Sequence, residues 1–297
     1  MSARRPSVDV VVPFQGSAAE LEDLQNRLAR IELREGDSLL VADNTPGDAR
    51  PGTLHAPEIP TPAYARNRGA AEGSNDWLVF VDADTTPAPD LLDRYFDPSP
   101  AERTALLAGG IADEPVPPDG PAAARYAYVR GFMSQDDTLR FGNWSFPKTA
   151  NAAVRRAAFE ELGGFREELR AAEDADLTYR LKAAGWGMER REQASVVHHN
   201  RRTLRGFVRQ KLDHGAGGAW LQRAHPGSSP GRRLPGLLWW GARHAVGGLF
   251  AAARTRDRDR ALWAVFEPVE LIAHELGRWR SNERGASPQP PDRARPS

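Results

Sequence analysis

The chain has 297 residues, no cysteine and a formal net charge of zero at pH 7. A chain of this length can bury a large core, and without cysteine it has no disulfide, no thiolate zinc site and no cysteine nucleophile. The charge is uneven, because residues 201–297 carry 18 basic and 8 acidic side chains, so we expect that part to face an anionic surface or the acidic residues 1–200.

The first 85 residues alternate between strand and helix patterns. Apolar runs at residues 8–12 and 38–42 predict two buried strands, the second of which is closed by a turn that starts at Asp43. Leucines at helical spacing after Ser17 predict a helix between these strands, and residues 64–73 predict another. This alternation predicts a parallel sheet with right-handed crossovers.

A third apolar strand, at residues 77–81, is followed by two acids, Asp82 and Asp84. The acids therefore lie at the carboxyl end of a buried strand, where open α/β sheets bind their ligands. Two carboxylates this close repel each other unless a cation lies between them, and Mg²⁺ and Mn²⁺ prefer such oxygen ligands. The alternative is a turn in which one of the acids caps the next helix.

Shorter patterns follow in the middle of the chain. They predict a break that divides the chain into subdomains at residues 114–121, strands at 105–111 and 194–198, and helices at 90–96, 155–162 and 173–184. The strand at 194–198 ends in two histidines, His198 and His199.

The helix predicted from residue 173 begins with a cluster of acids. Leu177 and Leu181 form its buried stripe, and Asp174 lies on that stripe, three and seven residues before them. Asp176 points elsewhere and is expected to form a surface pair with Arg180. Asp174 is therefore directed inward at the start of a helix, where a capping acid need not point.

Two amphipathic helices are predicted near the end of the chain. Their apolar stripes are Trp239, Ala242, Val246, Leu249, Phe250 and Ala253 in the first, and Leu262, Val265, Phe266, Val269, Ile272, Leu276 and Trp279 in the second. A kink or restart is expected at Pro268, and the polar residues 281–297 are expected to be disordered. No apolar run approaches the roughly 20 residues of a membrane span.

Five stretches, in this order, resemble the family 2 glycosyltransferases of the GT-A fold: residues 10–13, 65–69, 79–84, 163–165 and 173–177, which read VVVP, ARNRG, VFVDAD, GGF and EDADL. The resemblance covers residues 7–205. It implies an α/β protein with a Rossmann-like, mostly parallel sheet flanked by helices and followed by a C-terminal helical extension. The parts are then a nucleotide-sugar-binding half (1–115), an acceptor-binding half (116–205), the extension (206–280) and the tail (281–297).

The resemblance implies an inverting transferase that takes a sugar from a UDP- or GDP-linked donor with the help of Mn²⁺ or Mg²⁺. The acceptor would be a saccharide, a lipid-linked molecule or a small molecule, and no nucleic acid is expected as a partner. The residues matched to the donor nucleotide are Pro13, Phe14, Asp43 (which would read the base), Arg66 and Asp82. Those matched to the metal are Asp82, Asp84 and His198, with His199 as the alternative histidine.

An inverting displacement needs a base that takes the proton of the acceptor hydroxyl, and Asp174 has the inward register that this role requires. Glu173 and Trp144 are expected in the acceptor region, with core packing as the alternative for the tryptophan. Arg209 and Gln210 lack the nearby tryptophan of a motif found in processive polysaccharide synthases, which favours a single addition.

Two other functions fit the same acids. Asp82 and Asp84, followed by two threonines, also match the motif of haloacid-dehalogenase-type phosphatases, in which Asp82 would be the nucleophile and Asp84 the acid/base. The second alternative is a domain that binds sugar nucleotides without turnover. The presence of Asp174 argues against it, because a binding domain needs no inward base.

The basic residues close to Trp239 (Arg232, Arg233 and Arg243) suit a helix at a membrane interface. We therefore expect a cytoplasmic protein with peripheral contact at the inner face of an anionic membrane. The alternative is that these helices pack on the catalytic core and turn an arginine-rich face outward.

Overall fold

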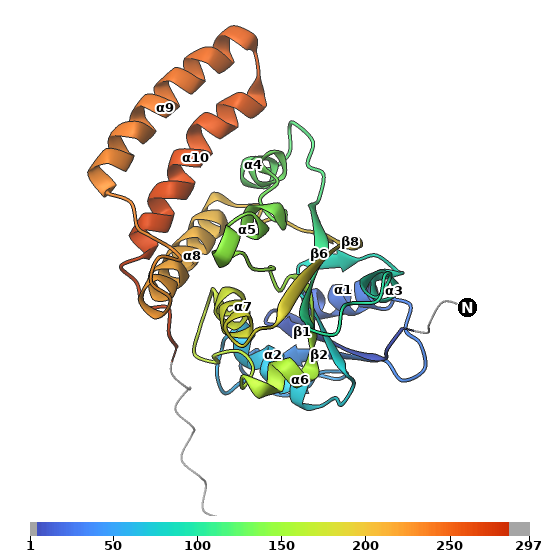
Figure 1. Cartoon of the computed structure of the whole chain (residues 1–297). Helices are drawn as coiled ribbons and strands as arrows, with labels where there is room; N and C mark the ends of the chain where they lie inside the picture. Colours follow the sequence, from blue (N-terminus) through green and yellow to red (C-terminus); the bar gives the residue numbers. More distant parts are fainter. Residues whose placement is uncertain (1–4, 285–297) are drawn as a thin grey trace, which may run out of the picture.

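A computed structural model describes residues 5–284 and shows a sheet covered by helices on both faces, with a pair of helices projecting from it (Figure 1). Within this range the sheet has eight strands, in the order β3-β2-β1-β4-β7-β6-β8-β5. They are β1 (Val8–Phe14), β2 (Ser38–Asp43), β3 (Leu54–His55), β4 (Trp77–Val81), β5 (Thr85–Pro87), β6 (Thr104–Asp113), β7 (Asn151–Arg155) and β8 (Gly187–His198).

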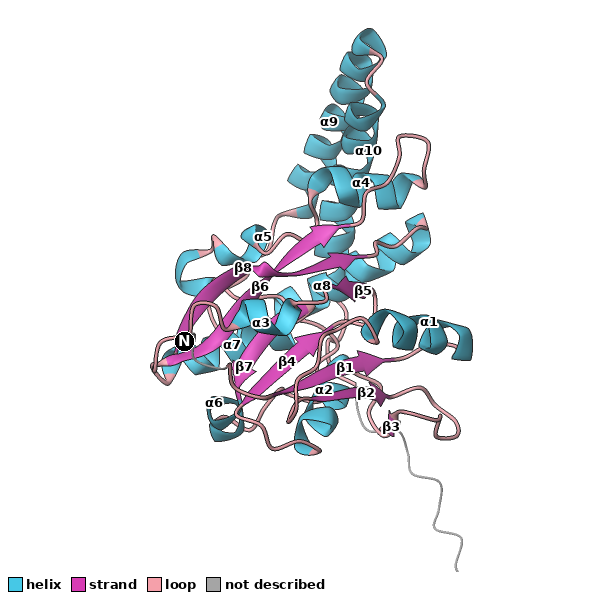
Figure 2. Ribbon diagram, turned by 90° about the vertical axis from the view of Figure 1, so that its right-hand side faces the viewer, coloured by secondary structure: helices cyan, strands magenta, loops and turns pink. Residues whose placement is uncertain are grey.

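The helices alternate with the strands in the first half of the chain and follow one another at its end (Figures 1 and 2). They are α1 (Ala18–Leu28), α2 (Pro62–Ala71), α3 (Leu91–Tyr95), α4 (Ala122–Arg130), α5 (Asp136–Leu139), α6 (Arg156–Glu161), α7 (Glu173–Ala183), α8 (Leu204–Ala224), α9 (Leu234–Thr255) and α10 (Arg258–Gly277). None of these helices is long and apolar enough to cross a membrane.

The predicted mostly parallel sheet is confirmed, with two strands that run the other way. β1 pairs in parallel with β2 and β4, β2 with β3, and β6 with β8. β7 is antiparallel to both β4 and β6, and β5 is antiparallel to β8. The carboxyl ends of β1, β2 and β4 therefore lie at the same edge of the sheet, as the strand–helix alternation predicted.

Apolar side chains cover both faces of the sheet because successive residues of a strand point to opposite sides. On one face, Val10 and Val79 pack against α1 and α3. On the other face, Val11, Leu78 and Phe80 pack against α2, α6 and α7. A strand buried on both faces reads as a continuous apolar run, which explains the pattern at β1 and β4.

Several elements differ from the sequence predictions. The predicted helix at 155–162 is α6, but the residues before it form the strand β7, and β8 begins at Gly187 instead of residue 194. The elements β3, β5, α4, α5 and α8 were not predicted. Among the described strands, β6 alone pairs with the first half of β8. Charged side chains can therefore stand along this half, and they hide the strand pattern. α8 carries glycines where it meets α10, since a Cβ atom at Gly215 would lie 1.9 Å from the carbonyl oxygen of His274.

The end of the described chain also differs from expectation. α10 continues through Pro268 without the restart that the proline suggested. Residues 281–284, expected to begin a disordered tail, instead run beside residues 168–171. The amide of Arg170 donates to the carbonyl oxygen of Asn282 (3.0 Å), and the amide of Arg284 donates to that of Glu168 (2.8 Å). The remainder of the predicted tail, 285–297, lies outside the described residues.

Candidate functional site

The loop that holds the two predicted acids, Asp82 and Asp84, leaves the carboxyl end of β4. Arg27 of α1 donates to the carbonyl oxygen of Ala83 (3.0 Å) and to that of Thr85. The side chains of both acids are 28% exposed. The loop is thus fixed through its backbone while its carboxylates stay accessible.

A buried arginine joins the first acid to the start of α7. Arg66 lies on α2, is 3% exposed, and donates to Oδ1 of Asp82 (2.5 Å) and to Oε1 of Glu173 (2.6 Å). Burial alone would lower the pKa of Arg66, but the charges of Asp82 and Glu173 raise it. The Nε atom of Arg66 is buried and has no hydrogen-bond partner among the described residues. A single guanidinium therefore holds together parts of the chain that lie 107 residues apart.

Asp174 follows Glu173 in the first turn of α7 and is half-buried. Burial raises the pKa of the Asp174 carboxyl to about 7, and the charge of Glu173 adds to this effect. Its Oδ1 accepts the amide of Ala175 (2.8 Å), which opposes the shift in part. A carboxyl group with a pKa near neutral can take up a proton at neutral pH.

The start of α7 has an unusual backbone. Ala172, directly before the helix, has a φ of 70°, and no side chain caps the helix. This left-handed conformation costs a residue other than glycine about 1–2 kcal/mol. Such strain persists only where the surroundings impose it, and here it lies next to Glu173 and Asp174.

Asp84 and His198 face each other where β5 meets β8. Thr85 pairs with His198 in the sheet, and Nε2 of His198 lies 3.4 Å from Oδ1 of Asp84. The other oxygen of Asp84 lies 3.2 Å from Arg201. Burial alone would raise the pKa of Asp84, but the hydrogen bond and charge of His198, with the charge of Arg201, hold that pKa at about 2.

The two neighbouring histidines have different surroundings. His198 is 3% exposed, and its Nδ1 atom is buried without a hydrogen-bond partner in the described part of the chain. The ring of His199 instead lies 2.8 Å from the hydroxyl of Thr86 and 3.0 Å from Glu114. Of the two candidates, His198 is the one that faces Asp84.

The Asp84–His198 pair offers one oxygen and one nitrogen ligand to a divalent cation. Between residues 5 and 284, no group of three or more histidines and acids is arranged to hold a metal ion. The 3.4 Å separation of the two atoms is nevertheless close to the ~3 Å that separates neighbouring ligands when each metal bond is about 2.1 Å. Mg²⁺ is commonly bound by one or two carboxylates together with substrate phosphates. The residues present therefore fit a cation that shares its ligands with a diphosphate.

The residues expected at the nucleobase lie at the ends of β1 and β2. Asp43 is fully buried, and its two oxygens accept from Arg50 at 2.6 and 2.7 Å. The Arg50 guanidinium lies 5.1 Å from the centre of the Phe14 ring, which is 5% exposed and packs in the core. Pro13 is buried beside them. A ligand would therefore meet Arg50 before it reached Asp43.

On the other side of the site, Trp144 is engaged in packing. Its ring lies edge-on to Tyr179, with 5.0 Å between the ring centres, and it joins a cluster formed by residues of α7 and α8. Core packing is the alternative to a place in the acceptor region that the sequence left open for Trp144.

The predicted pair of Asp176 with Arg180 is formed, but its expected place at the surface is wrong. Asp176 is 0% exposed and accepts from Arg180 (2.9 Å) and from His225 (2.9 Å), and it lies 3.3 Å from Arg166. Helix α7 is covered on a second side by α8 and the residues that follow it, which the sequence analysis did not place. The face away from Leu177 is therefore buried as well.

Basic residues around the site, which the sequence patterns did not indicate, include Arg50, Arg201 and Lys148. Lys148 donates to the carbonyl oxygens of Phe132 (3.4 Å) and Ser134. Burial lowers its pKa to about 8, against the opposing charges of Asp137, Asp174 and Asp113. The rarity of lysine could have drawn attention to Lys148, because only three of the 40 basic residues of the chain are lysines.

The chain is similar to known proteins over most of its length. A family model described as "Glycosyltransferase like family 2" matches residues 41–215. The chain is 30% identical over 240 residues to a pre-mycofactocin glycosyltransferase of Mycobacterium tuberculosis, covering 74% of this chain and 48% of that protein. It therefore spans about half the length of this relative.

Two further similarities extend over nearly the whole chain. It is 26% identical over 312 residues to the succinoglycan biosynthesis protein ExoA of Rhizobium meliloti, covering 91% of this chain and 93% of that protein. The solved structure of the mannosyltransferase PcManGT from Pyrobaculum calidifontis, in complex with GDP-Man and Mn²⁺, has a TM-score of 0.63 at 17% identity. It covers 93% of this chain and 88% of that protein. The GT-A fold expected from the sequence is the fold observed.

Proposed function

Since the chain belongs to glycosyltransferase family 2, we propose that it transfers a sugar from a UDP- or GDP-linked donor to an acceptor hydroxyl, in a single addition with inversion. The observation that best supports this proposal is the bridge of Arg66 between Asp82 and Glu173. It joins the acids after β4, which suit a diphosphate-bound cation, to the helix start that carries Asp174.

On the donor side, Asp84 and His198 would hold Mn²⁺ or Mg²⁺ together with the donor diphosphate, with Asp82 beside them. The bound ion would neutralise the negative charge that develops on the leaving nucleoside diphosphate. Arg201, whose side chain is 54% exposed, can turn from Asp84 toward the same phosphates. The mannosyltransferase of the same fold was solved with GDP-Man and Mn²⁺, which supports a donor of this class.

On the acceptor side, Asp174 would act as the general base. As the acceptor oxygen attacks the anomeric carbon, the bond from that carbon to the diphosphate breaks, and Asp174 takes the hydroxyl proton. Its pKa of about 7 suits this task, which contributes about 10²–10⁴-fold to the rate. Glu173 is already engaged with Arg66, so it would position the base rather than replace it. The acceptor would be a saccharide, a lipid-linked molecule or a small molecule.

Family membership removes the phosphatase alternative for Asp82 and Asp84. The position of Asp82 agrees with this, because its Oδ1 is held by the buried Arg66, whereas a nucleophile must approach a phosphorus atom freely. A binding domain without turnover remains the competing function, and a transfer assay separates the two.

The donor can be identified by thermal shift with UDP-, GDP- and dTDP-sugars, with and without Mn²⁺. A ligand that binds only the folded protein raises its stability by mass action. We expect one nucleotide class to raise Tm strongly, and only with the metal. If no nucleotide shifts Tm in the presence of Mn²⁺, the proposed transferase activity is wrong.

The adjacent histidines provide a matched pair for the metal assignment. His198→Gln should remove the metal-dependent part of the donor shift, as should Asp84→Ala. His199→Gln should leave it unchanged, because His199 contacts Thr86 and Glu114 instead of Asp84. Equal effects of the two histidine variants would contradict the assignment.

A further inference from the structure

The outward face of α9 is apolar. Leu238, Trp239, Val246, Leu249 and Phe250 are 54, 66, 71, 44 and 66% exposed. With 3.6 residues per turn, these five positions fall within an arc of about 120° around the helix. All of them except Leu238 belong to the apolar stripe that the sequence predicted, and the structure turns these side chains toward solvent.

The opposite face of α9 is the one that packs on α10, and it does so through small residues. A Cβ atom at Gly248 would lie 2.5 Å from that of Ala264, and one at Gly241 would lie 3.2 Å from that of Pro268. The apolar stripe of α9 is therefore not used to hold the hairpin together. Contiguous apolar surface of this kind usually marks a binding surface.

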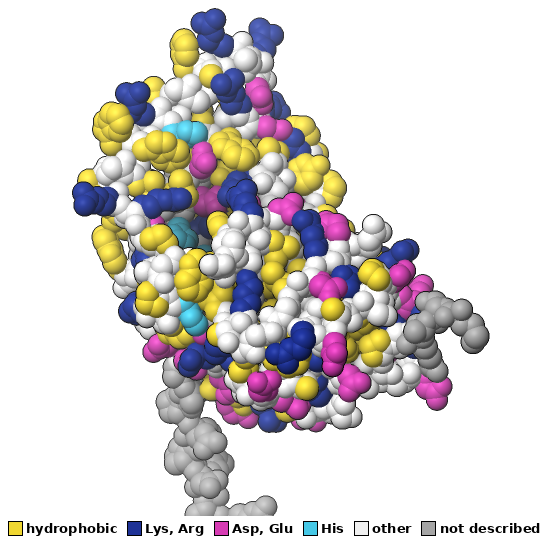
Figure 3. All heavy atoms as spheres, viewed as in Figure 1, with side chains coloured by type: hydrophobic (Ala, Val, Ile, Leu, Met, Phe, Trp, Pro, Cys, Tyr) yellow, Lys and Arg dark blue, Asp and Glu magenta, His cyan; other side chains and the backbone are white. Residues whose placement is uncertain are grey.

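Basic side chains surround this stripe. α9 contains no aspartate or glutamate, and Arg243 lies 4.7 Å from the Trp239 ring centre. Seven arginines in and next to the hairpin form no ion pair with any carboxylate of residues 5–284: Arg232, Arg233, Arg243, Arg254, Arg256, Arg258 and Arg260. Figure 3 shows basic and hydrophobic side chains interspersed over the projecting hairpin.

The four acids of α10 do not neutralise these arginines, because each lies next to another basic side chain. Asp259 pairs with Arg125. Glu270 binds Lys211 (2.8 Å), Glu267 lies 3.2 Å from His244, and Glu275 lies 3.6 Å from Arg278. The outer surface of the hairpin therefore carries an excess of positive charge.

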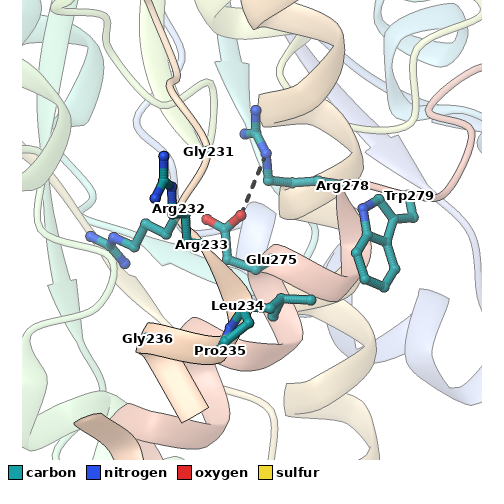
Figure 4. A pocket seen from close by; sticks show the side chains of 9 residues that line it. All are labelled: Gly231, Arg232, Arg233, Leu234, Pro235, Gly236, Glu275, Arg278 and Trp279. Atoms are coloured by element: carbon teal, nitrogen blue, oxygen red, sulfur yellow. Dashed lines mark ion pairs between the residues drawn. The ribbon is translucent and has the colours of Figure 1, made fainter. Parts of the chain in front are cut away.

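A pocket of about 820 Å³ lies where α9 begins and α10 ends (Figure 4). Arg232, Arg233 and Arg278 line it together with Trp279, which is 76% exposed. Glu275 also lines it and pairs with Arg278, so the three arginines outnumber one acid. Leu234, at the start of α9, also lines the pocket, so the basic pocket is continuous with the helix that carries the apolar stripe. Guanidinium groups next to an apolar stripe suit a phosphate that is attached to an acyl chain.

We propose that the outer face of α9, with the pocket at its start, docks on an anionic lipid membrane. The helix would lie in the plane of the interface, with its apolar arc toward the acyl chains and its arginines at the level of the headgroup phosphates. A second copy of the chain fits this face less well, because a symmetric contact would bring the unpaired arginines of both copies together. The proposal does not depend on the proposed transfer reaction.

Co-sedimentation of the full chain with vesicles tests the proposal. We expect binding to vesicles of phosphatidylglycerol and phosphatidylcholine at low salt, weaker binding as salt rises, and little binding to phosphatidylcholine alone. Arg232→Gln with Arg233→Gln should weaken the partition by about tenfold. Val246→Ser with Phe250→Ser should weaken it at least as much. Phe141→Ser, which changes a side chain 54% exposed but outside the hairpin, should leave binding unchanged.

Three results would overturn the proposal. The first is no binding to anionic vesicles at low salt. The second is equal binding of Val246→Ser/Phe250→Ser and the unaltered protein, with folding of the variant verified by circular dichroism. The third is a dimer seen by light scattering that the same double variant dissociates, because a second copy would then cover this face.

Discussion

Replacing Asp174 by asparagine should stabilise the protein at high pH while it removes transfer activity. In the folded protein the pKa of Asp174 is raised from its ordinary value of 3.8 to about 7 by burial and by Glu173. An acid of this kind disfavours the folded state when it is ionised. The cost is absent below about pH 4, grows as the pH rises toward about 7, and is constant above that value. Asparagine is neutral throughout and avoids it.

The magnitude follows from the size of the pKa shift. A change of one in the pKa corresponds to about 1.4 kcal/mol of free energy. The full change in the pKa of Asp174 would therefore be worth about 4 kcal/mol. Because the carboxyl is only half-buried, solvent screening lowers this value, and we expect Asp174→Asn to gain about 1–3 kcal/mol of unfolding free energy at pH 8. The gain should shrink steadily between pH 7 and pH 5.

The assay is urea unfolding of both proteins at several pH values between 5 and 8, with a chelator and without donor. The same preparations are then compared in a transfer assay, where loss of the base should lower the rate about 10²–10⁴-fold. A stability difference that is constant between pH 5 and pH 8 would show that Asp174 does not titrate near pH 7. Normal transfer by the variant would show that it is not the base.

Three further substitutions test contacts around the site. Asp176→Asn should lower the unfolding free energy by about 2–4 kcal/mol in urea, because Arg166 and Arg180 lose the counter-charge of this buried carboxylate. Arg66→Lys should leave the fold intact but reduce the donor-induced rise in Tm, since an ammonium lacks the planar fork that reaches both Asp82 and Glu173. Gly215→Ala should destabilise the protein by about 1–3 kcal/mol, because the new methyl group meets the backbone of α10, and scanning calorimetry would report it as a lower Tm.

Each of these substitutions has a matched control. Asp174→Asn is the same exchange in the same helix and should stabilise rather than destabilise. Arg68→Lys changes another arginine of α2 for which the structure shows no ion pair among residues 5–284. At Gly236 no atom of a neighbouring residue in the described part of the chain lies within 4 Å of an added Cβ, so Gly236→Ala should be close to neutral. A variant that behaves like its control would contradict the contact on which its prediction rests.

The parts of the fold that the sequence predicted correctly are those set by local patterns. β1 and β4 are buried on both faces, so their apolar runs stand out. Ser17 caps α1 in a capping box completed by Glu20. β8 and α8 could not be predicted from local patterns, because their composition depends on contacts with residues far away in the sequence. The glycines of α8 are explained only by the close approach of α10.

The same distinction holds for the site. Arg66, Asp82 and Glu173 were each candidates, but their contact depends on how α2 and α7 pack against the end of β4, which no local pattern states. The choice between His198 and His199 depended on the pairing of β8 with β5. The error at Asp176 arose because periodicity identifies one buried face of a helix, and α7 has two.

The shared arginine also bears on how the site forms during folding. Arg66 is buried, and it is balanced only when both Asp82 and Glu173 are in place. If α7 were displaced, the guanidinium would remain in a medium of low polarity with one of its two partners missing. The two halves of the site should therefore belong to one cooperative unit that opens and closes together. A partly folded chain would then offer no half-built pocket in which a donor could bind without a base beside it.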